Sequence, residues 1–287
     1  MSEALNPRLH AFRADLADER LRGKVNAERF VTPTKMRVIA PFADILREPD
    51  ERSGLDTQAL HGDGISVFET RGDWCWVQCD RDGYTGYAKA DALGGSGPAV
   101  THMVLAPRTF RYSKPDLKSA RTGYLSMGSS VCVVDEVTTR GTDYLVLDRG
   151  DALIAGHLMP NGQWQDDPVA VAQTLLHAPY LWGGTTGFGL DCSGLISLAQ
   201  RLCGRTVLRD TSMQCDSIGD PIDPGADFDA LQRGDLVFWN GHVGMMSDSE
   251  NLLHANGHSM NVALEPLHGA IARIGYLYGQ PTIVRRP

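Results

Sequence analysis

The sequence lacks any long apolar segment. No stretch approaches the roughly 18–20 consecutive apolar residues that a membrane-spanning helix needs. The first residues, MSEALNPRLHAFRADLADERL, contain no apolar core of the kind found in secretion signals. We therefore expect a cytoplasmic protein with no membrane partner.

Cysteine and positive charge are also scarce. The six cysteines include no C-x-x-C pair, and they are few for a disulfide-stapled secreted fold. Cys75 and Cys79 lie in DWCWVQCD, which is typical of a strand, so we expect both thiols in a barrel core rather than at a metal. The net charge of −8 provides no basic surface for nucleic acid, which excludes it as an expected partner.

The pattern along the 287 residues divides the chain into four parts. Residues 1–33 are charged and helix-compatible, and they predict an extension that docks on the body. Residues 34–98 and 99–158 each contain short alternating strands separated by turn signals, as a small β-barrel does, and together they form a weak internal repeat. Residues 159–287 place helices before a β-meander, which is an α+β order.

Elements of the last part can be read from periodicity. DPVAVAQTLLHA predicts a helix, and GDLVFWNGHVGMMSDSENLLHANG predicts two strands joined by a polar turn. Further strands are expected in NVALEPL and near IGYLYG. The predicted fold class is therefore α+β, with two small barrels ahead of a domain of helices and antiparallel strands.

A glycine-rich loop leads into a strongly helical segment in GTTGFGLDCSGLISLAQRLCG, residues 184–204. Apolar residues recur at helical spacing after Cys192, and Gly204 stands where a C-terminal cap belongs. Backbone N–H groups at a helix start favour a thiolate, which predicts a thiol pKa below the ordinary value of about 8.5. Cys192 is therefore a candidate nucleophile, the alternative being a small apolar residue at a helix start. Cys203 and Cys215 lack this position and are expected to be structural.

A cysteine nucleophile needs a base and a group that orients the base. His242 begins the strand HVGMMS, and His254 lies in LLHANG beyond a turn at residues 248–250. Both can face the same side of a hairpin. Asn256 and His258 share the alternating face of His254, so spacing leaves them open as alternatives.

Three segments, YLWGGTTGFGLDCSGL, RGDLVFWNGHVGM and LLHANG, resemble the NlpC family of papain-like cell-wall peptidases in composition, order and spacing. The resemblance covers the C-terminal part of the chain, and the two preceding barrels resemble bacterial SH3-like domains. The whole arrangement is similar to the γ-D-glutamyl-L-diamino acid endopeptidases that trim peptidoglycan stem peptides. It implies a papain-like fold and a thiol peptidase.

The resemblance implies roles for the central residues. Cys192 is expected to be the nucleophile, His242 the general base and acid, and His254 the residue that fixes the imidazole tautomer. The hydroxyl of Tyr180 is expected near the oxyanion, beside the backbone N–H of Cys192. No metal and no organic cofactor is needed for this chemistry.

The same resemblance implies substrate contacts close to the nucleophile. Asp191 and Ser193 flank it and are expected to touch the substrate. Asp210, in LRDTSMQ, is expected to hold the free α-amine of the substrate. Arg209 is expected to pair with a carboxylate or with Asp210 itself.

The first barrel is also implied to contribute. Similar enzymes place an acidic residue and a tyrosine from this barrel at the N-terminal end of the substrate. Asp63 in LHGDGI and Tyr84 in DGYTGY are the matching positions, with a turn aspartate and a barrel-packing tyrosine as the alternatives. Asp63 departs from the glutamate expected there, and its reach is shorter.

The expected substrate is a recycled murein peptide such as L-Ala-γ-D-Glu-diaminopimelate, cleaved after D-glutamate. An amidase or transpeptidase on other γ-glutamyl amides and a catalytically silent wall-binding protein are the alternatives. The sequence leaves open the diamino acid, the use of wall-linked substrates, the oligomeric state and whether the first barrel gates the site.

Overall fold

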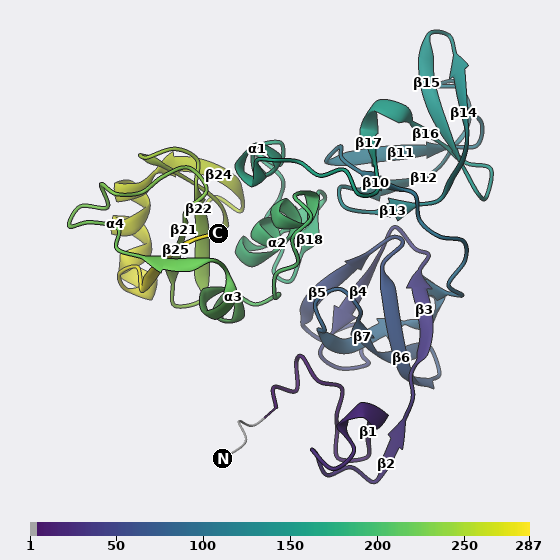
Figure 1. The fold of residues 1–287 in the computed structure, drawn as a ribbon, viewed down its shortest axis with the longest axis horizontal. Coiled ribbons are helices and arrows are strands. Elements are labelled where there is room, and N and C mark those ends of the chain that lie inside the picture. The colour runs from purple at the N-terminus through teal and green to yellow at the C-terminus, as the bar shows by residue number, and fades with distance from the viewer. Residues whose placement is uncertain (1–4) are drawn as a thin grey trace. The chain divides into compact units, whose positions relative to one another are not determined.

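The computed structural model describes residues 5–287, which divide into two compact units after Asn161 (Figure 1). The first unit holds an N-terminal extension and two strand-rich barrels, and the second holds the four α-helices of the described residues. The predicted boundaries after residues 33, 98 and 158 stay predictions. Of the helices within residues 5–287, none has the length and apolar character required to cross a membrane.

The extension docks on the first barrel, as predicted. Leu16 is fully buried in a cluster with Phe68 and Trp76 of that barrel. The Arg13 guanidinium lies 4.3 Å from the centroid of the Trp76 ring. Residues 5–33 form no α-helix but two short strands and a 3₁₀ turn: β1 (Leu16–Asp18), η1 (Glu19–Leu21) and β2 (Arg29–Val31). Residues 1–4 of the predicted extension lie outside the described residues.

Barrel 1 is an antiparallel sheet in the order β5-β4-β8-β7-β6-β3-β9. Its elements are β3 (Thr34–Val38), β4 (Phe42–Leu46), β5 (Leu55–Leu60), β6 (Gly64–Arg71), β7 (Trp74–Cys79), β8 (Thr85–Lys89), η2 (Ala90–Ala92) and β9 (Leu93–Gly94). Cys75 and Cys79 are four residues apart on β7, so their side chains point to the same face of the strand. Both are buried in the barrel core. Their predicted role as packed thiols is confirmed.

Barrel 2 consists of a five-stranded sheet, β12-β11-β16-β15-β14, and a three-stranded sheet, β13-β10-β17. Its elements are β10 (His102–Val104), β11 (Arg108–Tyr112), β12 (Arg121–Ser126), β13 (Ser130–Val131), β14 (Val133–Thr139), β15 (Thr142–Leu147), β16 (Ala152–Ile154), η3 (Ala155–His157) and β17 (Leu158–Pro160). Val104, Leu125 and Leu153 are fully buried at its centre.

The second unit has the α+β order that the sequence predicts, with an antiparallel sheet in the order β20-β25-β21-β22-β23-β24. The helices are α1 (Pro168–Gln173), α2 (Cys192–Leu202), α3 (Thr211–Ser217) and α4 (Leu267–Tyr278). The strands are β18 (Thr185–Thr186), β19 (Gly189–Leu190), β20 (Asp220–Ile222), β21 (Leu236–Trp239), β22 (His242–Met246), β23 (Asn251–Asn256), β24 (Asn261–Pro266) and β25 (Ile283–Arg286).

Helices cover both faces of this sheet. Figure 1 shows α2 and α4 on opposite sides of β21, β22 and β25. All four residues of β21 are buried, as expected for a strand covered on both faces. Val237, Met246 and Leu252 pack with α4. Because side chains alternate along a strand, His242 and His254 share that same face of the sheet.

Two predicted elements differ from the structure. The segment that alternates after Gly234 forms three strands rather than two, since β21 and β22 pair through a tight turn at residues 240–241. IGYLYG is not a strand but the end of α4. Leu267, Ala270, Ile271 and Ile274 recur at helical spacing and are all buried, so the period of the longer segment overrides the short run.

Candidate active site

Capping fixes the nucleophile at the start of α2. The Asp191 carboxylate accepts the Gly194 backbone N–H at 2.7 Å, which satisfies one of the unpaired donors of the first turn. A Cβ at Gly194 would lie 2.1 Å from the Gly184 carbonyl oxygen, so only glycine lets the loop pack this closely on the helix. Cys192 is therefore held on rigid backbone.

A buried ion pair locks this cap in place. Arg209 forms a bidentate pair with Asp191, in which its guanidinium donates to both carboxylate oxygens at 3.0 and 2.6 Å. A further bond of 2.7 Å runs from the Arg209 guanidinium to the Ser193 hydroxyl. All three side chains are buried, so the network excludes water below the nucleophile.

Cys192 opens into a cavity of about 410 Å³. His242 lines the same cavity, which brings the predicted nucleophile and the predicted base together. Tyr180 and Trp182 precede the nucleophile in the chain and form part of the wall. The remaining lining residues are Gly241, Asn256, Gly257, His258, Arg273, Ile274, Leu277 and Tyr278.

A line of hydrogen bonds leads away from the base. His242 Nε2 lies 2.8 Å from His254 Nδ1, and His254 Nε2 lies 2.7 Å from a carboxylate oxygen of Glu265. Arg273 on α4 pairs with that same oxygen. His254 is fully buried, so these contacts fix its ring.

Glu265 decides both imidazole tautomers. Its pKa lies below the ordinary value, chiefly because of the hydrogen bond from His254, so the carboxylate is ionised and can only accept. His254 therefore carries its proton on Nε2. The unprotonated Nδ1 of His254 accepts a hydrogen bond from the Nε2–H group of His242. Nδ1 of His242 is left without a proton, which is the state a general base needs.

Asn256 lies beside the same ring. Its side-chain nitrogen is 3.2 Å from His254 Nε2, and because both atoms are donors in this tautomer, the Nε2 hydrogen bond goes to Glu265. Its oxygen accepts the backbone N–H groups of His258 and Ser259. Asn256 therefore orients the loop beyond the strand, and Glu265 controls the proton.

The resting pair is neutral. Burial, and next the Asp191 carboxylate, raise the pKa of the Cys192 thiol. Burial lowers the pKa of His242 to about 3, and its neighbours His254 and Arg273 act in the same direction. A thiol and a neutral imidazole therefore face the substrate, and the proton moves only during attack.

Two hydroxyl groups complete the site. Cys192 Sγ lies 3.6 Å from the Thr211 hydroxyl at the start of α3. Burial raises the pKa of Tyr180, so its hydroxyl keeps its proton and can donate to a developing oxyanion.

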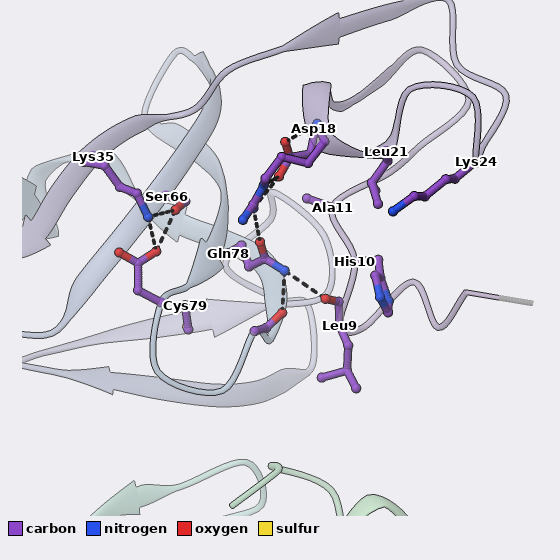
Figure 2. Close-up of a pocket in the computed structure, with 13 residues that line it drawn as sticks. Leu9, His10, Ala11, Asp18, Leu21, Lys24, Lys35, Ser66, Gln78 and Cys79 are labelled. Atoms are coloured by element: carbon purple, nitrogen blue, oxygen red, sulfur yellow. Dashed lines mark hydrogen bonds and ion pairs between the residues drawn. The ribbon is translucent and has the colours of Figure 1, made fainter. Parts of the chain in front are cut away.

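A second cavity, of about 450 Å³, lies between the extension and barrel 1. Two ion pairs lie in its wall, Lys35 with Asp80 at 2.9 Å and Arg20 with the buried Asp18. Figure 2 shows the Lys35 ammonium beside Ser66, to which it donates a hydrogen bond. Within residues 5–287, no three His, Cys, Asp or Glu side chains are arranged to bind a metal ion.

Comparison with known proteins identifies the C-terminal unit. Residues 177–277 match the model of the NlpC/P60 family, and residues 45–93 match the bacterial dipeptidyl-peptidase SH3 domain. The probable endopeptidase NlpC of Escherichia coli is 34% identical over 111 residues, which cover 34% of this chain and 69% of that protein. The chain belongs to the NlpC/P60 family of cysteine peptidases.

Longer relatives include both units of this NlpC/P60 peptidase. Dipeptidyl-peptidase 6 of Lysinibacillus sphaericus is 29% identical over 247 residues, covering 78% of this chain and 89% of that one. The γ-D-glutamyl-L-lysine dipeptidyl-peptidase of Bacillus cereus is 27% identical over 258 residues, covering 75% and 71%. A solved NlpC/P60 protein from Bacillus cereus shares the fold, with a TM-score of 0.74, 22% identity, and coverage of 88% and 99%.

The thiol pKa differs from the sequence prediction. It is raised rather than lowered, because burial and the Asp191 charge outweigh the helix start. Asp191, Ser193 and Arg209 are all buried, and Arg209 pairs with the Asp191 carboxylate. The predicted contacts of these three residues with substrate stay predictions.

The roles predicted for the two positions in barrel 1 stay predictions. Tyr84 is 2% exposed. The Asp63 carboxylate accepts the Leu60 backbone N–H at 2.9 Å. Asp210 is half-buried at the start of α3, and its role with the substrate amine stays a prediction.

Sequence reasoning missed Glu265, Arg273 and Thr211. Glu265 could have been found, because residues 254 and 263 pair across β23 and β24, and Glu265 shares the face of residue 263. Arg273 was hidden by the expected strand near IGYLYG. Thr211 had no local signal, since its contact with Cys192 spans two helices.

Replacing Glu265 by glutamine removes the charge that sets the tautomers. We expect Glu265→Gln to lower kcat by roughly tenfold, a fraction of the 10²–10⁴ that general acid–base catalysis contributes, with little change in KM. Steady-state kinetics measures this split. Glu250→Gln, on an exposed turn, is the matched control and should keep full activity. An unchanged kcat in Glu265→Gln would contradict the tautomer argument.

The pH dependence of thiol alkylation tests the neutral pair. Burial disfavours the thiolate, so we expect the rate of iodoacetamide reaction at Cys192 to rise with pH past the ordinary cysteine value of about 8.5. Mass spectrometry of the Cys192 peptide gives the rate at each pH. A plateau already reached below neutral pH would show a resting thiolate–imidazolium pair instead.

Proposed function

We propose that this peptidase hydrolyses the amide bond between γ-D-glutamate and a diamino acid in short peptidoglycan peptides with a free N-terminal L-alanine. The observation that carries the proposal is the shared cavity of Cys192 and His242 with the aligned relay behind the base. The names of the Bacillus relatives specify the γ-D-glutamyl bond, which supports this substrate class.

The mechanism follows from the protonation states. Nδ1 of His242 takes the Cys192 proton as the sulfur attacks the carbonyl carbon after D-glutamate. In this proposal the Cys192 backbone N–H and the Tyr180 hydroxyl donate to the oxyanion. The imidazolium then gives its proton to the departing amine, and water hydrolyses the thioester with His242 again as base.

Charge beside the nucleophile supports recognition of a free amine. Arg209 and Asp191 pair with each other, and Asp210 adjoins Arg209 in the chain. The Asp210 carboxylate is the group that we propose for the ammonium of an N-terminal alanine. A blocked amine would place an uncharged group against this carboxylate.

A role in recycling fits a preference for small free peptides. The six cysteines are free thiols, which suits the reducing cytoplasm, so we propose that compartment as the place of action.

The test compares L-Ala-γ-D-Glu-diaminopimelate with its N-acetylated form. We expect a preference for the free peptide of at least about tenfold, from the loss of one charge-assisted contact, and a smaller preference in Asp210→Asn. Equal cleavage of both peptides would contradict the proposed recognition of a free N-terminal amine. Cleavage of neither would overturn the proposed substrate class.

A further inference from the structure

We propose that Arg273 makes the leaving-group side of the cavity selective for a diamino acid whose side chain ends in a carboxylate, as in diaminopimelate, over one that ends only in an ammonium, as in lysine. This inference rests on the proposed function and names the specificity of the same site.

The chemistry decides which half of the cavity holds the leaving group. His242 must protonate the departing amine, so that amine lies within hydrogen-bond reach of the imidazole. The diamino acid therefore extends past His242. The cavity lining includes α4, which contributes Arg273, Ile274, Leu277 and Tyr278. Arg273 connects to His242 through Glu265 and His254, so we assign α4 to the leaving-group side.

Arg273 lines the cavity that we assign to the leaving group. Its guanidinium gives one nitrogen to Glu265, and its side chain is 27% exposed in the cavity wall. Among residues 5–287, its other N–H groups have no protein partner. A guanidinium held along one edge can bind a substrate carboxylate along the other.

The position of Arg273 favours a contact with the side-chain carboxylate of the leaving group over a contact with its α-carboxylate. Three contacts, through His254 and Glu265, separate Arg273 from the base. The α-carboxylate lies next to the scissile nitrogen, whereas the side-chain carboxylate of diaminopimelate lies at the end of a methylene chain. Leu277 lines the cavity and is largely exposed, so it offers apolar surface to those methylenes.

The two diamino acids differ at that end in charge. The last carbon of diaminopimelate carries an ammonium and a carboxylate, so its net charge is zero and it can pair with the guanidinium. Lysine ends in an ammonium alone, which has only N–H donors and cannot accept a hydrogen bond from the guanidinium. Glu265 does not line the cavity and binds Arg273 from the relay side, so the remaining N–H groups of Arg273 select for an acceptor.

The test measures kcat/KM for L-Ala-γ-D-Glu-meso-diaminopimelate and L-Ala-γ-D-Glu-L-lysine. We expect the wild-type enzyme to prefer the first by about tenfold, the size of one charge-assisted contact at a part-exposed site. Arg273→Met should bring the ratio close to one, and Arg273→Lys should keep part of it.

The ratio separates the possible outcomes, because it does not depend on the fraction of folded enzyme. Equal wild-type rates for both peptides, or an unchanged ratio in Arg273→Met, would overturn the inference and leave the proposed function intact. If the wild-type enzyme cleaves neither peptide, the proposed function fails and the inference fails with it.

Discussion

Cys192→Ala is expected to lower kcat/KM by at least about 10⁴-fold, because no other group in the cavity can form the thioester. The fold should persist, since the thiol contributes one weak contact to Thr211 and the α2 cap comes from Asp191. Peptide hydrolysis followed by mass spectrometry measures the loss, and circular dichroism checks the fold.

Cys203→Ala and Cys215→Ala are the matched controls. Cys203 follows the last residue of α2, and Cys215 lies within α3, so neither stands at the start of α2 or lines the cavity of His242. Both variants should keep wild-type activity. Turnover that survives in Cys192→Ala, or is lost in either control, would contradict the assignment of the nucleophile.

Arg209→Met is expected to lower the free energy of unfolding by about 3–5 kcal/mol, because it leaves the Asp191 charge buried without a partner. Asp191 also caps α2, so the loss spreads to the helix that carries Cys192. Urea denaturation of wild type and variant measures the difference, and activity should fall at temperatures where the variant unfolds.

Arg233→Met provides the comparison on the same unit. Arg233 pairs with Asp167 at 2.7 Å, but both side chains are about two-fifths exposed. Solvent screens this pair, so its loss should cost less than about 1 kcal/mol. Similar losses in the two variants would contradict a special role for the buried pair.

The local signals that the sequence carries predicted the centre of the site. The helical spacing after Cys192 and the glycine cap at Gly204 lie within one segment, and the structure has both. The hairpin that joins His242 and His254 follows from alternation around a polar turn. The alternating pattern of residues 34–98 likewise predicted barrel 1, and its two cysteines are buried in the core as expected.

Features that depend on packing between distant segments could not be predicted from the sequence. The pairing of Arg209 with Asp191 depends on where α3 begins relative to α2, because the two residues lie on different elements. The thiol pKa depends on the burial that this packing produces.

The most direct test of the account is the identity of the products from L-Ala-γ-D-Glu-diaminopimelate. A thiol attack at the γ-glutamyl carbonyl predicts the dipeptide L-Ala-D-Glu and free diaminopimelate, with neither formed by Cys192→Ala. Mass spectrometry of the reaction identifies both. Release of free alanine, or product formation that persists in Cys192→Ala, would contradict the account.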